Sequence, residues 1–389
     1  MTMTGHHKHL LFPPAASVRG RTAELMNRTI LFLVLSLLCA SPLLAKQEIC
    51  VKGPMGRDYY LYLPDKIDPA KTYWLVVGVH GYRGNGKGGS GVAGWPDRYD
   101  CIAVAPSFPD GFQGLEKQTD IQLLQIFSEL QRKYRLYPKL FVTGHSGGSQ
   151  FAHRFASHHP DQTIACAASS GGTWETGAGY GSFSPAAKTI PIAISCGDKD
   201  NSISPNMKGV PWGRYDWAKH FEKNLSDGGY FFKAKYWPGA GHGGYGPGIE
   251  QLRNESFSLG TSGLIGQGAK ERDEALKKIN TLLESGDIVG ATSAMKAICD
   301  RMRLRTAGQF AADLKANGWQ GGDAAAAECA RRCAQFWTDQ LSELGRRIAA
   351  RGKDSPASRI SQPALRTPLD TLQRATSTPA PFSPAATVK

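Results

Sequence analysis

Short apolar runs recur along the chain between residues 58 and 237, and segments with helical spacing separate them. The longest run, 73–79, is apolar at nearly every position, which is typical of a strand buried on both faces of a sheet. The alternating pattern at 58–63 predicts an edge strand. The same reasoning predicts further strands at 101–105, 140–142, 164–169, 190–195 and 230–237.

The segment 119–135 has the spacing of an amphipathic helix, and Asp120 lies in its first turn, where the helix dipole favours a carboxylate. Its apolar residues recur with a helical period: Ile121, Leu124, Phe127 and Leu130. Helices are also expected at 150–157 and 215–225. Strands that alternate with helices predict an α/β fold, in which helices cover both faces of a mostly parallel sheet.

The pattern changes at residue 267, beyond which Ala, Leu, Lys and Glu dominate with helical spacing. Helices are predicted at 271–283, 290–302, 307–315 and 323–351. We therefore expect a small all-helical appendage over 267–351, which serves packing or oligomerisation rather than binding. From 352 to 389 the chain is rich in Ser, Thr, Pro and Ala, a composition that predicts a disordered tail.

The N-terminal region has the pattern of an export signal. Residues 26–45 contain a basic start, a short apolar core and small residues that end at Ala45, as in a cleaved signal peptide. Residues 1–25 are predicted to be a disordered upstream extension, and 46–260 a catalytic domain. The mature protein is accordingly expected to be secreted or periplasmic, without a stable membrane anchor.

The charge of the chain bears on its partners, and its cysteines bear on disulfide formation. The net charge is +13, but the basic residues are scattered, so we interpret them as a solvated surface and expect no nucleic-acid partner. Without Cys39, which lies in the signal region, seven cysteines remain. An exported chain can form disulfides, and Cys299 could pair with Cys329 or Cys333. The oligomeric state is left open.

The strongest chemical motif is Gly144-His145-Ser146-Gly147-Gly148, which follows the apolar run 140–142 and precedes a helical segment. It fits G-x-S-x-G, the nucleophile elbow, in which a serine occupies a sharp turn between strand and helix. Small neighbours let strand and helix pass closely, and the free N–H groups at the helix start favour a developing negative charge. Ser146 is the predicted nucleophile.

A serine hydroxyl needs a general base and an orienting carboxylate, which follow in the order Ser, Asp, His in this fold. His242 lies in a glycine-rich loop after the strand at 230–237 and is the predicted base. Asp198 and Asp200 both follow the strand at 190–195. Asp200 is preferred as the acid, because Gly197, Asp200 and Ile203 match the spacing G-x-x-D-x-x-V that often surrounds the acid after such a strand. Asp198 remains the alternative.

The tetrahedral intermediate needs two N–H donors for its oxyanion. The backbone N–H of Gly147 is one predicted donor, and that of Tyr82, in the loop after the strand at 73–79, is the other. His80 is expected to order this loop. Aromatic residues on nearby loops predict an acyl or aryl ester substrate, with Trp95, Trp174 and Tyr245 as candidate binding residues.

Residues from Trp74 to about Tyr245 resemble an α/β-hydrolase, and within that superfamily the secreted polyhydroxybutyrate depolymerase / feruloyl esterase-like branch. The resemblance implies ester hydrolysis without a metal or an organic cofactor, with Ser146, Asp200 and His242 as the triad. The chain departs from that branch in its helical appendage and in the short loop after Gly172, which leaves no room for a lid domain. It is carried by the segments 79–81, 90–95, 102–106, 137–148, 159–161 and 167–172.

Two other functions compete with a secreted ester hydrolase that acts on a small-molecule or polymeric ester. A serine peptidase of the same fold would use the same triad on an amide. A non-catalytic exported binding protein could also use this scaffold, but its triad would be broken, whereas every residue type that the triad needs is present.

Overall fold

The computed structural model describes residues 48–115, 117–174, 183–203 and 210–351. Its centre is an eight-stranded sheet with the strand order β1-β2-β4-β3-β5-β6-β7-β8. The strands β1 and β2 run antiparallel at one edge, and β3 to β8 are parallel to one another. The strands are β1 (Ile49–Lys52), β2 (Asp58–Tyr62), β3 (Tyr73–Val79), β4 (Cys101–Pro106), β5 (Leu136–His145), β6 (Thr163–Ser169), β7 (Ile192–Gly197) and β8 (Phe232–Trp237).

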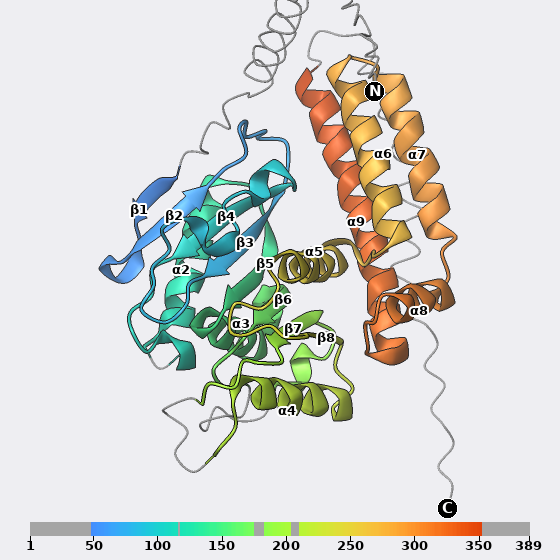
Figure 1. The fold of residues 1–389 in the computed structure, drawn as a ribbon. Coiled ribbons are helices and arrows are strands. Elements are labelled where there is room, and N and C mark those ends of the chain that lie inside the picture. Colours follow the sequence, from blue (N-terminus) through green and yellow to red (C-terminus); the bar gives the residue numbers. More distant parts are fainter. Residues whose placement is uncertain (1–47, 116, 175–182, 204–209, 352–389) are drawn as a thin grey trace, which may run out of the picture. The chain divides into compact units, whose positions relative to one another are not determined.

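Alternating side chains of the central strands supply two separate cores. Leu75 and Val77 of β3 point to one face, which α2 (Thr119–Lys133), α3 (Gly147–His158) and α4 (Arg214–Asp227) cover. Val76 points to the other face, which is covered by α5 (Gly246–Ser262). Figure 1 shows α5 on the sheet side opposite α2 and α3. This two-sided cover explains why β3 is apolar at nearly every position.

The strand order and the strand–turn–helix at Ser146 are those of an α/β-hydrolase, so the predicted fold class is confirmed. The predicted strands all form, with ends shifted by a few residues. One apolar position of α2 was misassigned: Ile121 is exposed, and Leu123 and Ile126 are buried instead. The helix period was therefore correct, and Phe127 and Leu130 are buried, but Leu123 and Ile126 take the place of Ile121 on the packing face.

Helix α5 was not predicted, because its sequence is rich in glycine, which lowers helix propensity. The glycines are required by close packing. A Cβ on Gly248 would come within 2.2 Å of the Trp237 ring, and one on Gly260 within 2.8 Å of Ala165. Contact with β8 and β6 thus selects residues that local propensity disfavours.

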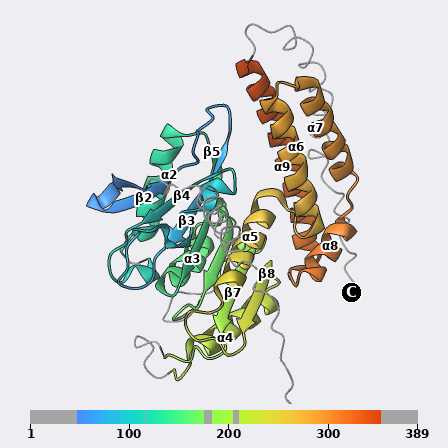
Figure 2. The same cartoon turned by 45° about the horizontal axis from the view of Figure 1, so that its top comes forward.

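Residues 267–351 form four helices, α6 (Gln267–Glu284), α7 (Ile288–Arg303), α8 (Ala307–Ala316) and α9 (Gly322–Arg351). They lie beside α5 in both views (Figures 1 and 2), and α9 packs against α5. Cys299, Cys329 and Cys333 are buried in α7 and α9 as free thiols. The disulfide considered for the appendage is therefore absent from this structure.

The predicted upstream extension (1–25), signal peptide (26–45) and C-terminal tail (352–389) lie outside the described residues. Within the described ranges, no helix has both the length and the apolar character needed to cross a membrane.

Candidate active site

Ser146 lies at the apex of the turn between β5 and α3, at the carboxyl end of the central strand. Its backbone angles are φ 57° and ψ −120°, a region that non-glycine residues avoid and that stores strain at functional sites. The turn is tight because a Cβ on Gly148 would lie 2.1 Å from the Val79 carbonyl oxygen. One on Gly144 would lie 2.3 Å from the Gly148 carbonyl carbon. The elbow therefore needs the glycines that the motif contains.

Three side chains from separate loops meet at this apex. His242 Nε2 lies 3.0 Å from Ser146 Oγ, and His242 Nδ1 lies 2.8 Å from Asp200 Oδ2. In the neutral tautomer that fits these contacts, Nδ1–H donates to the carboxylate and Nε2 accepts the serine proton. The three residues that the sequence predicted as a triad are thus in contact, over separations of 96 and 42 positions in the chain.

Both carboxylate oxygens of Asp200 have a partner, His242 at Oδ2 and Arg214 at Oδ1. The residue is 2% exposed, and Arg214 Nη1, at the start of α4, lies 3.2 Å from Oδ1. Burial by itself raises the pKa of this carboxyl, but the hydrogen bond and charge of His242, with a contribution from Arg214, more than offset it. The pKa of Asp200 therefore lies below its ordinary value.

Asp198, the alternative acid, has a different hydrogen-bond partner. Its Oδ1 accepts a hydrogen bond of 2.8 Å from the backbone N–H of Gly239. It thus ties the β7 loop to the β8 loop, while Asp200 contacts His242. The geometry favours Asp200.

The predicted oxyanion donors also approach each other. A Cβ placed on Gly147 would lie 2.9 Å from the backbone nitrogen of Tyr82, so these two residues are neighbours. His80 holds the Tyr82 loop in place. Its Nδ1–H donates to the Gly81 carbonyl at 2.7 Å, and its Nε2 accepts from the Phe108 N–H at 3.0 Å.

His145, the variable position of the elbow, has a structural contact that the sequence analysis missed. Its Nε2 lies 2.7 Å from the carbonyl oxygen of His242, and the two rings are 4.8 Å apart. This contact fixes the backbone of the loop that carries His242, the predicted base. The sequence indicates only that His145 adjoins Ser146. It does not indicate the contact, because His242 is 97 positions away.

Two of the three aromatic residues predicted to bind substrate do not line the site. Trp95 is fully buried on the α5 side of the sheet, where it packs against Phe141 and Phe257. Trp174 is 1% exposed and stacks in the core beneath α3 and α4. The predictions for Trp95 and Trp174 were wrong, because an aromatic side chain on a loop can point into the core. Tyr245 is 54% exposed and remains a candidate.

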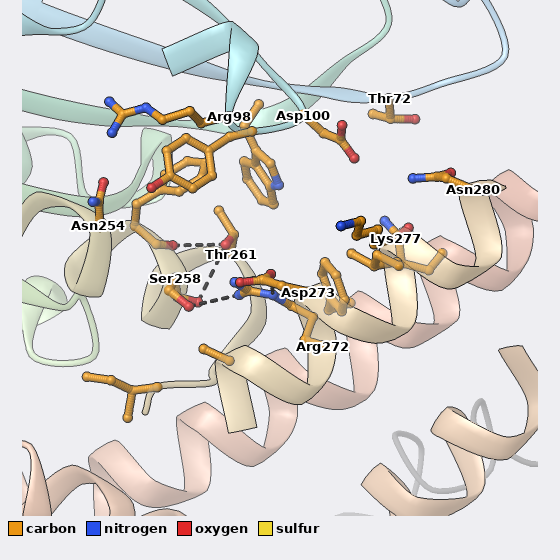
Figure 3. A pocket seen from close by; sticks show the side chains of 18 of the residues that line it. Thr72, Arg98, Asp100, Asn254, Ser258, Thr261, Arg272, Asp273, Lys277 and Asn280 are labelled. Atoms are coloured by element: carbon orange, nitrogen blue, oxygen red, sulfur yellow. Dashed lines mark hydrogen bonds and ion pairs between the residues drawn. The ribbon is translucent and has the colours of Figure 1, made fainter. Parts of the chain in front are cut away.

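A pocket of about 740 Å³ lies elsewhere, between the sheet and the appendage (Figure 3). Its walls come from the amino ends of β3 and β4 and from α5, α6 and α9, and none of the triad residues lines it. Figure 3 shows Asp100 and Thr72 on the sheet side, opposite Lys277 and Asn280 of α6. Since the triad lies at the carboxyl ends of the strands, this pocket is separate from the candidate active site.

Comparison with solved structures finds proteins of similar fold. A thermostable esterase is 18% identical, with a TM-score of 0.45, over 55% of this chain and 63% of its own. The poly(3-hydroxybutyrate) depolymerase LpqC from Bordetella parapertussis is 20% identical, with a TM-score of 0.41, over 58% of this chain and 93% of its own. A ferulic acid esterase from Anaeromyces mucronatus is 16% identical, with a TM-score of 0.43, over 55% and 90%.

No family model matches the sequence, and no curated protein does.

Proposed function

We propose that this protein is an exported serine hydrolase that cleaves carboxylic esters through an acyl-enzyme. The observation that supports the proposal most directly is the continuous line of contacts from Ser146 through His242 to Asp200. Hydrogen bonds of this length and order are what transfer of the serine proton requires.

In the proposed first step, Ser146 Oγ attacks the ester carbonyl carbon as its proton passes to His242 Nε2. The oxyanion that forms accepts hydrogen bonds from the backbone N–H groups of Gly147 and Tyr82. When the tetrahedral intermediate collapses, the alcohol leaves with the proton from Nε2, and the acyl group stays on Ser146. Water then repeats the sequence, the acid is released, and the serine regains its proton.

The proposed substrate class is an acyl or aryl ester, small or carried by a polymer. The motif resemblance and the solved neighbours named as a depolymerase and ferulic acid esterases support this class. The proposed location is extracellular or periplasmic, on the pattern at 26–45. N-terminal sequencing of the exported protein checks this, with an end near residue 46 expected.

Labelling with a fluorophosphonate probe, together with hydrolysis of p-nitrophenyl butyrate, tests the activity. We expect both in residues 46–389 and neither in Ser146→Ala. Ser149→Ala is the matched control, because Ser149 is buried three positions along α3 and its hydroxyl bonds to no residue that the structure describes. Its one contact with Ser146, from the backbone N–H to the Ser146 carbonyl at 3.1 Å, is kept in the alanine variant. Labelling that persists in Ser146→Ala, or no labelling of the parent, contradicts the proposal.

Matched ester and amide substrates separate the proposed function from a peptidase. We expect kcat/KM on methyl ferulate, a 3-hydroxybutyrate trimer or another ester in the panel to exceed that on the corresponding amide. An amide preferred throughout such a panel would indicate a peptidase with the same triad.

A further inference from the structure

The loop between β4 and α2 is strained close to the candidate active site. Gly111, Leu115 and Gln118 have φ values of 77°, 66° and 55°, and two of these residues carry a side chain. A non-glycine residue in this region costs on the order of 1–3 kcal/mol and persists only where the surroundings impose it. Such strain tends to lie where a side chain must be held in a particular place.

The surroundings impose this conformation through buried contacts. Phe112 is fully buried, with its ring 4.8 Å from that of His80. Arg154 of α3, which is 2% exposed, donates from Nη1 to the Gln113 carbonyl oxygen at 2.8 Å and from Nη2 to Thr173 Oγ1 at 2.8 Å. The backbone of Gln113 is therefore fixed from both sides, by the core and by the helix that begins at the nucleophile.

The side chain of Gln113 reaches the predicted oxyanion donors. A Cβ placed on Gly147 would lie 2.9 Å from the Tyr82 nitrogen, 3.2 Å from Gln113 Nε2 and 3.4 Å from Gln113 Cγ. Two nitrogen donors from separate loops thus approach the same side of Gly147. Among the described residues, none is recorded as a hydrogen-bond partner of the Gln113 side-chain amide. Gln113 is half-buried, so its amide is accessible to a substrate.

We propose that Gln113 Nε2–H is a third oxyanion donor, which contacts the acyl oxygen together with the N–H groups of Gly147 and Tyr82. The inference rests on the proposed ester hydrolysis. A donor that is already positioned lowers the barrier because it needs no reorganisation when charge develops on the oxygen. The strained loop fixes the backbone from which the Gln113 side chain extends to Gly147, and so limits the positions that the amide can reach.

Gln113→Met tests the inference, because methionine has a similar length and no donor. We expect kcat/KM on p-nitrophenyl butyrate to fall by about 10²-fold, the usual effect of losing one oxyanion donor. The affinity for phenylboronic acid, whose serine adduct is tetrahedral, should fall in parallel. A residue with a packing role alone would change the melting temperature without this parallel loss. Gln131→Met, on the exposed side of α2, is the matched control.

Gln113→Glu keeps the shape of the side chain if methionine perturbs folding. It places a charged acceptor beside the oxyanion, so we expect a larger loss than with methionine. If the parent hydrolyses the ester and either variant stays within about twofold of it in kcat/KM, the inference is wrong and the proposed function stands. If the parent neither hydrolyses the ester nor labels at Ser146, the proposed function itself fails.

Discussion

Two carboxylates separated by a single residue, Asp198 and Asp200, have different roles at the residue scale. Asp200 is buried against His242 and Arg214, whereas Asp198 is hydrogen-bonded to a loop backbone. An acid in the triad holds the imidazole in the tautomer that accepts the serine proton. Only the carboxylate in contact with the ring can do this.

Asp200→Asn is expected to lower kcat by about 10⁴-fold, because an amide can donate to Nδ1 and stabilise the wrong tautomer. Asp198→Asn is the matched control and should retain kcat within about threefold. Steady-state kinetics on one ester, with fluorophosphonate labelling as a check on Ser146, measures both. The reverse ranking would assign the acid to Asp198.

His80 links pH to stability. Burial lowers its pKa below the ordinary 6.5, although the hydrogen bond to the Gly81 carbonyl opposes the shift. The unfolded chain therefore binds a proton at His80 that the folded chain does not, between 6.5 and the lower folded pKa. The stability that this residue contributes is present above pH 6.5 and is lost as the pH falls through the folded pKa.

We therefore expect the parent to lose more unfolding free energy between pH 7.5 and pH 5 than His80→Gln, whose side chain does not titrate. Urea unfolding at the two pH values measures the difference. His158→Gln is the control, since His158 is exposed at the end of α3. Equal pH losses in the parent and in His80→Gln would contradict the argument.

At the scale of elements, the close approach of the β3 and α3 backbones limits which residues the elbow can contain. Gly148 lies where β3 passes α3, and the Val79 carbonyl leaves no room for a Cβ. Ser146 can occupy the apex of the turn only because α3 begins so close to the sheet.

Gly148→Ala is expected to destabilise the fold by about 3 kcal/mol or more, because the contact is with backbone that cannot rotate away. Gly246→Ala, at the start of α5, meets nothing within 4 Å and should be neutral or slightly stabilising. Thermal and urea unfolding of the two variants provide the comparison. A Gly148→Ala protein as stable as the parent would show that the elbow can relax.

At the scale of the whole chain from β1 to α9, one buried arginine joins the appendage to the sheet domain. Arg332 of α9 is 6% exposed, and its guanidinium donates to the carbonyl oxygens of Ile164, Gly260 and Thr189. Glu328, one turn earlier in α9, balances its charge. These carbonyls lie at the start of β6, in α5 and before β7, so one side chain connects α9 to three elements.

Arg332→Met should destabilise the protein by about 3 kcal/mol, because it leaves three buried carbonyls with one partner fewer. Arg331→Met is the matched control: Arg331 is exposed and pairs with Glu328 within the same helix, so we expect a change within about 0.5 kcal/mol. Urea unfolding measures both. Equal effects would mean that α9 is not fixed through Arg332.

Local sequence determined the features that depend on neighbouring residues. The apolar runs specify strands, their alternation with helical segments specifies a parallel α/β sheet, and the glycines around Ser146 specify the elbow. The order Ser, Asp, His is what the resemblance to α/β-hydrolases implies, and the three predicted residues lie after β5, β7 and β8. These features were predictable because hydrophobic periodicity and turn chemistry act over fewer than about ten residues.

Only the tertiary structure decided which side chains point into the site and which into the core. Trp95 and Trp174 look like cleft residues in the sequence but fill the two cores. Gln113 lies beside Gly147, and His145 contacts the backbone carbonyl of His242. Helix α5 forms against its own glycine content. The physical reason is that these outcomes depend on contacts between segments far apart in the chain, which the sheet topology creates and local pattern does not encode.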